Sequence, residues 1–285
     1  MKAKSLAILA LALFAAFMAT GCAHKSADEG LKIISFNIRY NSWNDIDGEN
    51  RWDNRRDAVV RMIREERPAA IGLQEALIDQ LLYLDSCLPQ YRRIGVGRDD
   101  GKEAGEFMAI YYDTTQLEEV SNMSCTLWLS ETPWKASKGW DAACNRTVTC
   151  VLFSDKRSGQ WFSYHNTHLD HMGAVARAES AKYLATLTDE SEGFPLIVGG
   201  DMNSTIDDTI FRVLYNVGLQ DARTLTDSTS NAITYNAFGK GEGSVIDHFF
   251  VKDFEVVSFR TLDGDYGVPY ISDHYPIEIT LRFKQ

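Results

Sequence analysis

Short runs rich in apolar and β-branched residues recur along the chain and are separated by polar stretches. Runs of this length and composition are typical of β-strands. The pattern predicts strands at Leu31 to Ile38, Ala69 to Leu73, Phe107 to Tyr112, Thr147 to Phe153, Trp161 to Asn166, Leu196 to Gly199, Val245 to Val251 and Ile277 to Phe283.

Between some of these runs, apolar residues recur at helical spacing. Asp53 is a candidate N-cap for a helix that ends before Pro68, because proline disfavours a helical residue before it. Further helices are predicted at 173–187 and 207–216. Mixed strands and helices over this length predict an α/β fold, a four-layer α/β/β/α sandwich of two mixed sheets packed face to face with helices outside. Periodicity alone leaves a doubly wound single sheet open.

The first residues have the features of an export signal, because Lys2 and Lys4 precede an apolar run, Leu6 to Met18, that ends in small residues. At about 13 residues this run is shorter than the roughly 20 that a membrane-spanning helix needs. The segment Ala19 to Cys22 resembles the cleavage box of bacterial lipoproteins, in which the cysteine becomes the lipidated first residue. A chance cysteine at an ordinary signal-peptidase site is the alternative.

We therefore expect a lipoprotein signal peptide at 1–21, a lipidated tether at 22–30 and one large domain at 31–285. The protein would be exported and held at a membrane through the lipid on Cys22, on the periplasmic face or at the cell surface.

The charge balance of the chain is acidic, with 29 basic and 40 acidic residues and a formal net charge of −11. Loss of the two lysines of the export signal leaves 27 basic against 40 acidic residues, hence −13. An acidic surface disfavours broad nucleic-acid binding, which relies on Lys and Arg. Net charge does not report the field of a cleft in which a divalent cation supplies positive charge, so nucleic acid is a less favoured partner rather than an excluded one.

Four cysteines follow Cys22: Cys87, Cys125, Cys144 and Cys150. Export permits disulfides, and four cysteines allow three connectivities. Buried free thiols are equally consistent with the sequence. Residues on one face of a single strand do not meet, so a bridge between Cys144 and Cys150 is not expected.

Polar residues adjoin five of the predicted strands. They are Asn37, Gln74 with Glu75, His168, Asp201 to Asn203, and Asp273 with His274. A rigid strand aims a side chain at its end, and the adjoining loop leaves room for a ligand. A carboxylate that ends a buried run is costly unless it is paired, and a metal ion would resolve such an ending. Each motif alone is equally compatible with a turn or a salt-bridged strand end.

Three histidines between His165 and His171 make zinc a rival metal. Zinc usually takes further thiolate or imidazole ligands. The carboxylates and amides elsewhere suit a harder cation such as Mg²⁺ or Mn²⁺.

Taken in order, six short motifs resemble those of the endonuclease/exonuclease/phosphatase superfamily. They are Leu31 to Asn37, Leu73-Gln74-Glu75, Asn166-Thr167-His168-Leu169, Gly200-Asp201-Met202-Asn203, Ile246-Asp247-His248 and Ser272-Asp273-His274. Each is weak evidence alone, but six in this order across the mature chain are not expected by chance. The resemblance implies that 31–285 is a catalytic domain in which an activated water attacks a phosphate ester with the help of a divalent metal.

The resemblance also implies the metal ligands. Glu75 would bind Mg²⁺ or Mn²⁺, with Asn37 beside it and Asp273 close to the same shell, which suits a cation that keeps several waters. The abasic-site branch of the superfamily has an aspartate two residues past the opening asparagine. Here that position is Arg39, which puts a ligand arrangement based on that aspartate in doubt.

The catalytic groups are implied in the same way. Asp201 would orient or deprotonate the attacking water with help from Asn203. His274, held in one tautomer by Asp247, would contact the phosphoryl oxygens or share the role of base. His168 would stabilise the developing charge or protonate the leaving oxygen.

Two stretches rich in tryptophan, 40–52 and 126–140, adjoin the expected site. Aromatic rings among amides and acids suit a sugar or a lipid head group, so Trp43 is a substrate-binding candidate, although a core position fits tryptophan equally well. Arg146 is a candidate phosphate contact because a guanidinium fork matches phosphate oxygens, with a strand-end surface pair as the alternative.

The sequence therefore favours a monomeric phosphatase or phosphodiesterase that acts on small sugar phosphates or phospholipid head groups. A secreted nuclease that scavenges nucleic acid is the rival enzyme, although the basic loops that would serve it are sparse. A surface glycan-binding lipoprotein without catalysis is the rival of another class. The intact acidic and histidine motifs oppose that reading.

Overall fold

The computed structural model describes residues 30–42, 47–120, 123–191, 193–230 and 232–284. Leu31–Gln285 forms one compact unit. The predicted signal peptide, Cys22 and Trp43 lie outside the described residues. Within the described ranges, no helix combines the length and the apolar character needed to cross a bilayer.

The first sheet has the strand order β12-β13-β1-β2-β4-β3. Only β1 and β2 run parallel among its neighbouring pairs, so the sheet is mixed. Its strands are β1 (Leu31–Asn37), β2 (Ala70–Gln74), β3 (Tyr91–Ile94), β4 (Ile110–Asp113), β12 (Phe254–Thr261) and β13 (Ile277–Phe283).

The second sheet has the order β10-β11-β9-β8-β7-β5, and β6 also pairs with β7. β8 and β9 are parallel and the other pairs antiparallel, so this sheet is mixed as well. Its strands are β5 (Leu117–Glu119), β6 (Cys125–Trp128), β7 (Thr147–Asp155), β8 (Trp161–His168), β9 (Leu196–Asp201), β10 (Gln220–Asp221) and β11 (Asp247–Lys252).

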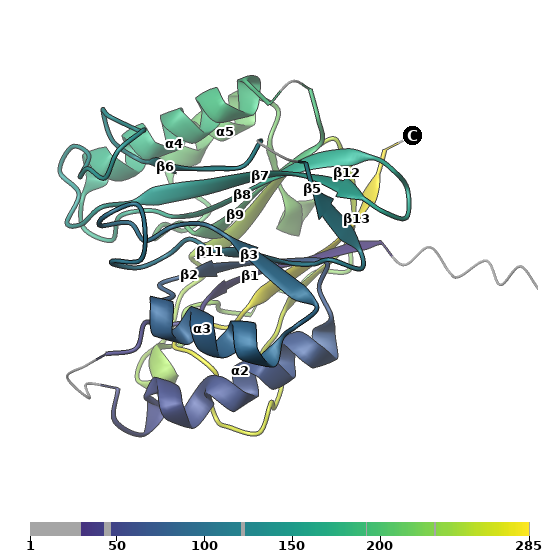
Figure 1. Cartoon of the computed structure of the whole chain (residues 1–285). Coiled ribbons are helices and arrows are strands. Elements are labelled where there is room, and N and C mark those ends of the chain that lie inside the picture. The colour runs from purple at the N-terminus through teal and green to yellow at the C-terminus, as the bar shows by residue number, and fades with distance from the viewer. Residues whose placement is uncertain (1–29, 43–46, 121–122, 192, 231, 285) are drawn as a thin grey trace, which may run out of the picture. The chain divides into compact units, whose positions relative to one another are not determined.

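Helices cover the outer face of each sheet (Figure 1). α2 (Trp52–Glu66) and α3 (Ile78–Cys87) pack on the first sheet, and α4 (Ala174–Asp189) and α5 (Arg212–Asn216) pack on the second. Short 3-10 turns lie at η1 (Gly48–Asn50), η2 (Thr209–Phe211), η3 (Ala222–Thr224) and η4 (Ala237–Gly239). A third apolar core, which includes Ile33, Tyr164 and Phe249, fills the space between the sheets. The predicted four-layer α/β/β/α sandwich is therefore confirmed, and the doubly wound alternative is wrong.

All the predicted strands form, but two helix details differ. The N-cap of α2 is Arg51 rather than Asp53, which lies in the first turn. The helix expected at 207–216 is split, because Asp208 caps the separate turn η2 through its side chain before α5 begins. The sequence pattern also missed α3 and the strands β3, β5, β6, β10 and β12.

Alternation along the strands decides where the polar strand ends point. In β8, Phe162 and Tyr164 face the inter-sheet core, so Asn166 and His168 fall on the same face. In β9, Ile197 faces this core and therefore so does Asp201 four residues later. The same rule places Asn37 at the inner end of β1 and Asp247 at the inner end of β11. The sandwich thus brings these polar ends together at one edge of the space between its sheets.

Candidate active site

Asn37 connects the two sheets at this edge. Its Nδ2 donates to Glu75 Oε1 and to Asp201 Oδ2, each at 3.0 Å. Glu75 directly follows β2 with a left-handed backbone (φ 63°), and its Oε2 accepts the Tyr40 amide proton at 3.2 Å. The Asn37 amide is fully buried, so these carboxylates are fixed by a donor that water cannot replace.

Glu75 and Asp273 face the same cationic group, the guanidinium of Arg39. Its Nη1 lies 3.8 Å from Glu75 Oε2, and its Nε lies 3.7 Å from Asp273 Oδ2. Burial raises the pKa of Asp273, and the nearby Glu75 charge adds to the shift. Ser272 Oγ donates to the Asn37 carbonyl oxygen at 2.7 Å, which holds the Asp273 loop against β1.

This group of carboxylates fits a hard divalent cation. Oxygen donors from Glu75 and Asp273 converge on a space that already favours positive charge. Asn37 directs Nδ2 toward the carboxylates and accepts the Arg39 amide proton on Oδ1, so its amide must turn over before the oxygen can bind a metal. Oxygen and nitrogen of such an amide are assigned from the hydrogen-bond network.

Arg39 is itself held by two further contacts. Its guanidinium donates to both carboxylate oxygens of Asp47, at 3.1 and 3.3 Å, and lies 4.5 Å from the centre of the Tyr40 ring. The fully buried Arg55 donates to the Arg39 carbonyl oxygen at 2.7 Å and to other backbone oxygens, and burial lowers the pKa of Arg55 to about 10. Arg55 therefore fixes the backbone of the segment that follows β1, and the Arg39 guanidinium faces Glu75 and Asp273.

Asp201 ends β9 between two imidazoles. Its Oδ2 lies 3.3 Å from His168 Nε2 and 3.6 Å from His274 Nε2. Its Oδ1 accepts the Asn203 amide proton at 3.0 Å. Burial raises the pKa of Asp201 to about 7, and the Asp247 charge adds to this effect while His274 opposes it. A carboxyl that titrates near neutrality is suited to accept a proton from water.

His168 stays neutral in this setting. Burial lowers its pKa well below the usual value, and the positive charges of Arg146 and Arg98 lower it further. Asn203 Nδ2 lies 3.0 Å from His168 Nε2 and donates to the Leu169 carbonyl oxygen at 2.9 Å. Of the two roles predicted for His168, this environment favours stabilisation of charge by a neutral imidazole over delivery of a proton.

His274 is the charged imidazole of the site. The register of β9 and β11 pairs Asp201 with Asp247, and Asp247 Oδ2 lies 2.8 Å from His274 Nδ1. Burial disfavours the charged imidazolium, but these two carboxylates outweigh it and raise the pKa of His274 to about 10. Ligand atoms of Asp201, Asp247 and His274 all lie within 4.8 Å of one another. A protonated His274 is suited to donate to an anionic oxygen rather than to act as base.

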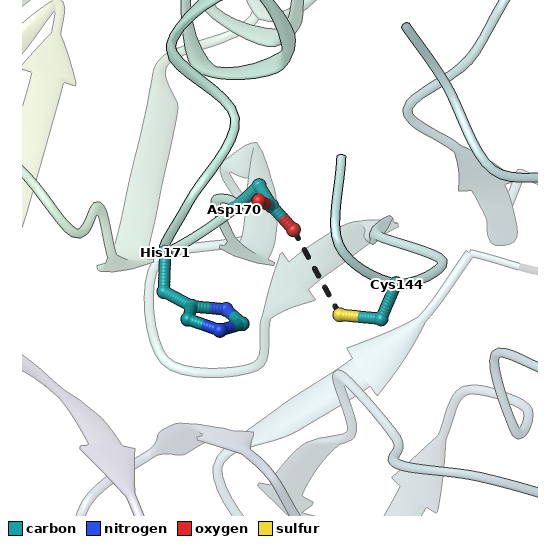
Figure 2. Close-up of side chains that lie close together, drawn as sticks. All are labelled: Cys144, Asp170 and His171. Carbon is teal, nitrogen blue, oxygen red and sulfur yellow. Dashed lines mark hydrogen bonds between the residues drawn. The ribbon is translucent and has the colours of Figure 1, made fainter. Parts of the chain in front are cut away.

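Arg146 lies just before β7 and is buried rather than part of a surface pair, with 4% exposure. Its Nε donates to Asp170 Oδ2 at 3.2 Å, and its Nη2 lies 2.9 Å from His171 Nδ1. Figure 2 shows Asp170 and His171 with the third member of this cluster, Cys144, whose thiol donates to Asp170. Arg146, the predicted phosphate contact, lies close enough to His168 for its charge to lower the pKa of that imidazole.

The side chains of Cys144, Asp170 and His171 lie close enough together to hold a metal ion. Their hydrogen bonds, however, position the Arg146 guanidinium. The Asp170 carboxylate accepts amide protons from Ala143, Met172 and Gly173, and these bonds help to hold its pKa well below the usual range. The cluster instead fixes the position of Arg146.

Arg98 and Glu106 are site residues that the sequence pattern did not reveal. Both lie between β3 and β4 and form a paired salt bridge, with nitrogen to oxygen distances of 2.6 and 2.9 Å. Burial raises the pKa of Glu106 to about 7, and the charge of Glu75 adds to it. Arg98 accepts the Trp128 indole proton on its carbonyl oxygen at 2.7 Å. Loop residues without periodicity carry no signal that would have identified them.

The tryptophans divide between core and surface. Trp52 and Trp128 are buried, whereas Trp134 is 75% exposed. Trp43, the substrate-binding candidate, lies outside the described residues. Trp134 is therefore the described tryptophan with most surface available to a ligand.

Comparison with known proteins places this chain in one family. The model of the endonuclease/exonuclease/phosphatase family matches residues 34–274. An endonuclease/exonuclease/phosphatase from Bacteroides vulgatus is 33% identical, with a TM-score of 0.83 over 89% of this chain and 99% of that one. A mannosyl-6-phosphatase from Bacteroides thetaiotaomicron is also 33% identical, with a TM-score of 0.83 over 89% of this chain and 100% of that one.

The similarity also extends to a viral protein. An uncharacterized protein of Acanthamoeba polyphaga mimivirus is 26% identical over 271 residues, and the match covers 87% of this chain and 99% of that protein. The matches thus span nearly the full length of each of these similar proteins.

Proposed function

Because the chain belongs to the endonuclease/exonuclease/phosphatase family, we propose that it is a divalent-metal-dependent hydrolase of phosphate esters that uses an activated water. The observation that carries the proposal is the buried Asp201 carboxyl, whose pKa is raised to about 7 between two imidazoles. A buried, strongly perturbed acid beside a cation-binding pair of carboxylates is typical of a hydrolytic site.

Asp201 is the proposed base. The Asn37 side chain and the Asn203 amide donate to its two oxygens, so the carboxylate has a fixed orientation from which to take the proton of an attacking water. The water oxygen then bonds to phosphorus, and the bond between phosphorus and the ester oxygen breaks. The leaving oxygen takes a proton from solvent and departs as an alcohol, and Asp201 returns its own proton to solvent.

The two histidines stabilise the negative oxygens. His274, held by Asp247 at 2.8 Å, presents a charged Nε2–H on the side of Asp201 where the phosphoryl group would lie. His168 acts as a neutral imidazole, consistent with its lowered pKa. Arg146, held by Asp170 and His171, contributes positive charge at the phosphate.

Glu75 and Asp273 would hold Mg²⁺ or Mn²⁺, with Asn37 joining them once its amide has turned. The bound cation would neutralise charge spread over the phosphoryl oxygens. Arg39 is held beside these two acids by its bidentate contact with Asp47.

For the substrate we propose a small sugar phosphate or a phospholipid head group. The mannosyl-6-phosphatase that is 33% identical over its full length supports the sugar phosphate. The rival is a nuclease, which the net charge of −11 disfavours. We also propose export and lipid anchoring at Cys22, supported by the apolar run and the cleavage box before it.

The test uses the chain without residues 1–22, because Leu31–Gln285 forms a compact unit by itself. Phosphate release and ester cleavage are measured with Mg²⁺ or Mn²⁺ and with chelator, on mannose 6-phosphate, other sugar phosphates, a phosphodiester, sphingomyelin and DNA. We expect turnover of a sugar phosphate that chelator abolishes. Cleavage of DNA alone would replace the substrate by nucleic acid. Tight glycan binding without turnover of any ester would replace the enzyme by a binding protein.

A further inference from the structure

Two cysteines lie opposite each other on the outer side of the second sheet. The antiparallel register of β6 and β7 pairs Cys125 with Cys150. Cys150 belongs to the apolar cluster that α4 and α5 cover, so the pair faces away from the inter-sheet site. Directly opposed residues on neighbouring antiparallel strands have Cβ atoms roughly 4.5 to 5.5 Å apart, a separation that approaches what a disulfide requires.

The two thiols differ in access and in acidity. Cys125 is exposed, whereas Cys150 is buried with 8% exposure. The Cys150 thiol donates a hydrogen bond to Cys125, which lowers the pKa of Cys125 to about 7 and raises that of Cys150. An accessible thiolate beside a buried second thiol is the arrangement in which one cysteine attacks and the other resolves.

A cavity gives a reagent access to this pair. It has a volume of about 190 Å³, and its lining includes Met123, Cys125, Leu127, Cys150, His165 and Phe194. His165 pairs with Cys150 across β7 and β8, and its Nδ1 is buried without a hydrogen-bond partner. Burial lowers the pKa of His165 to about 4, so a neutral imidazole lines the cavity beside Cys150.

We propose that Cys125 and Cys150 form a thiol–disulfide site that oxidises by exchange with a small-molecule disulfide such as oxidised glutathione. The Cys125 thiolate attacks one glutathione sulfur, which forms a mixed disulfide and releases one glutathione thiolate. The Cys150 thiol then attacks Cys125 Sγ, loses its proton to solvent and releases the second glutathione. The protein loses two electrons and two protons, and the glutathione disulfide is reduced to two thiols.

The other two described cysteines provide internal controls. Cys87 lies beside Ser86 and Tyr83, and Cys144 donates to Asp170. Burial raises the pKa of Cys144, which makes its thiolate scarce near neutral pH. Neither is expected to oxidise with Cys125 or Cys150.

The bond would join the start of β6 to the middle of β7 and close the chain between residues 125 and 150. β6 leads directly to Trp128, which donates to Arg98, and to Leu129, whose amide donates to the Arg146 carbonyl oxygen. The oxidised protein therefore gains a fixed connection behind the loop that carries Arg146. Closing a loop of this length restricts the unfolded chain, so Tm should rise by on the order of 5 °C.

The experiment equilibrates the full chain with mixtures of reduced and oxidised glutathione, blocks remaining thiols with N-ethylmaleimide and maps the peptides by mass. The expected product is one peptide pair joined at Cys125 and Cys150, with Cys87 and Cys144 alkylated. Peptide mapping on the wild-type protein decides the matter without any variant. Alkylation of both Cys125 and Cys150 in excess oxidised glutathione, or a bond to another cysteine, would overturn the proposal.

Single variants then separate the two roles. Cys150→Ser should trap glutathione on Cys125, whereas Cys125→Ser should leave the buried Cys150 unmodified. Cys87→Ser is the matched control and should form the bond as the wild type does. Equal glutathione labelling of Cys125 and Cys150 in the two variants would contradict the assigned order of attack. The outcome is independent of phosphate hydrolysis, so it neither supports nor weakens the proposed function.

Discussion

The two halves of the candidate site handle charge in different ways. On the second-sheet side, Asp201 and His274 are buried together, and their pKa values are raised to about 7 and about 10. On the first-sheet side, Glu75 and Asp273 face the guanidinium of Arg39, which keeps its proton. The same residue type, a carboxylate, therefore serves proton transfer in one half and cation binding in the other, and its neighbours decide which.

The largest effect should come from the proton-transfer half. Asp201→Asn removes the base while it keeps the size of the side chain, so kcat should fall about 10³-fold. Mn²⁺ affinity, measured by titration calorimetry, should stay within about twofold because Glu75 and Asp273 are untouched. The exposed Asp227→Asn is the control. Activity within tenfold of the wild type would remove Asp201 from the base role.

Asp247→Asn tests how neighbours set the two pKa values. The base must be deprotonated and His274 protonated, so kcat should rise through a pH near 7 and fall again near 10. Asp247 raises the pKa of both groups, so its loss should move both limbs to lower pH and reduce kcat about 10²-fold. A pH profile of unchanged position, measured in the variant, would show that Asp247 has only a structural role.

The cation-binding half should respond in metal affinity rather than in pH dependence. Glu75→Gln is expected to weaken Mn²⁺ binding by at least about 50-fold, because loss of a ligand costs no less than loss of a residue that only orients a ligand. Binding is followed by titration calorimetry or by the electron paramagnetic resonance signal of Mn²⁺. The exposed Glu242→Gln should bind as the wild type does. Full Mn²⁺ affinity in Glu75→Gln would place the metal elsewhere.

The smallest predicted effects concern Arg39 and its partner. Arg39→Ala removes a positive charge beside Glu75 and Asp273, so Mn²⁺ affinity should rise about fivefold, as expected for one charge in a largely hydrated site. Asp47→Ala frees Arg39 to approach the two acids, and the affinity should fall about threefold. Arg212→Ala, on the exposed side of α5, is the matched charge control. This interpretation requires that the Mn²⁺ affinity rise in Arg39→Ala and fall in Asp47→Ala.

Much of the site could be read from the sequence because strands fix where their last residues point. Asn37, His168 and Asp201 end buried strands and Asp247 begins one, and alternation alone sends all four side chains to one inner face. That Asn37 and Asp201 belong to one site was predicted from the order of the family motifs, because no local pattern shows that these residues meet across two sheets.

The remainder depends on contacts between loops, which have no period. Arg98 and Glu106 lie in such a loop, and the side chains of Trp128 and Asn145 both donate to the Arg98 carbonyl oxygen. The predicted N-cap of α2 was wrong. Asp53 is a residue type favoured at N-caps, but the N-cap is Arg51, two residues earlier. The edge strand β5 has three residues and β10 two, too short for an alternating pattern to show.

The pairing of β9 with β11 decides which side chains of β11 face the site. The register sets Asp247 opposite Asp201, while His248, on the other face, lies against Phe211 and the Ser204 carbonyl oxygen. A shift of one residue would exchange the faces of Asp247 and His248 and put an imidazole where His274 needs a carboxylate. A deletion of one residue inside β11 would therefore separate Asp247 from His274, although the chain becomes only one residue shorter.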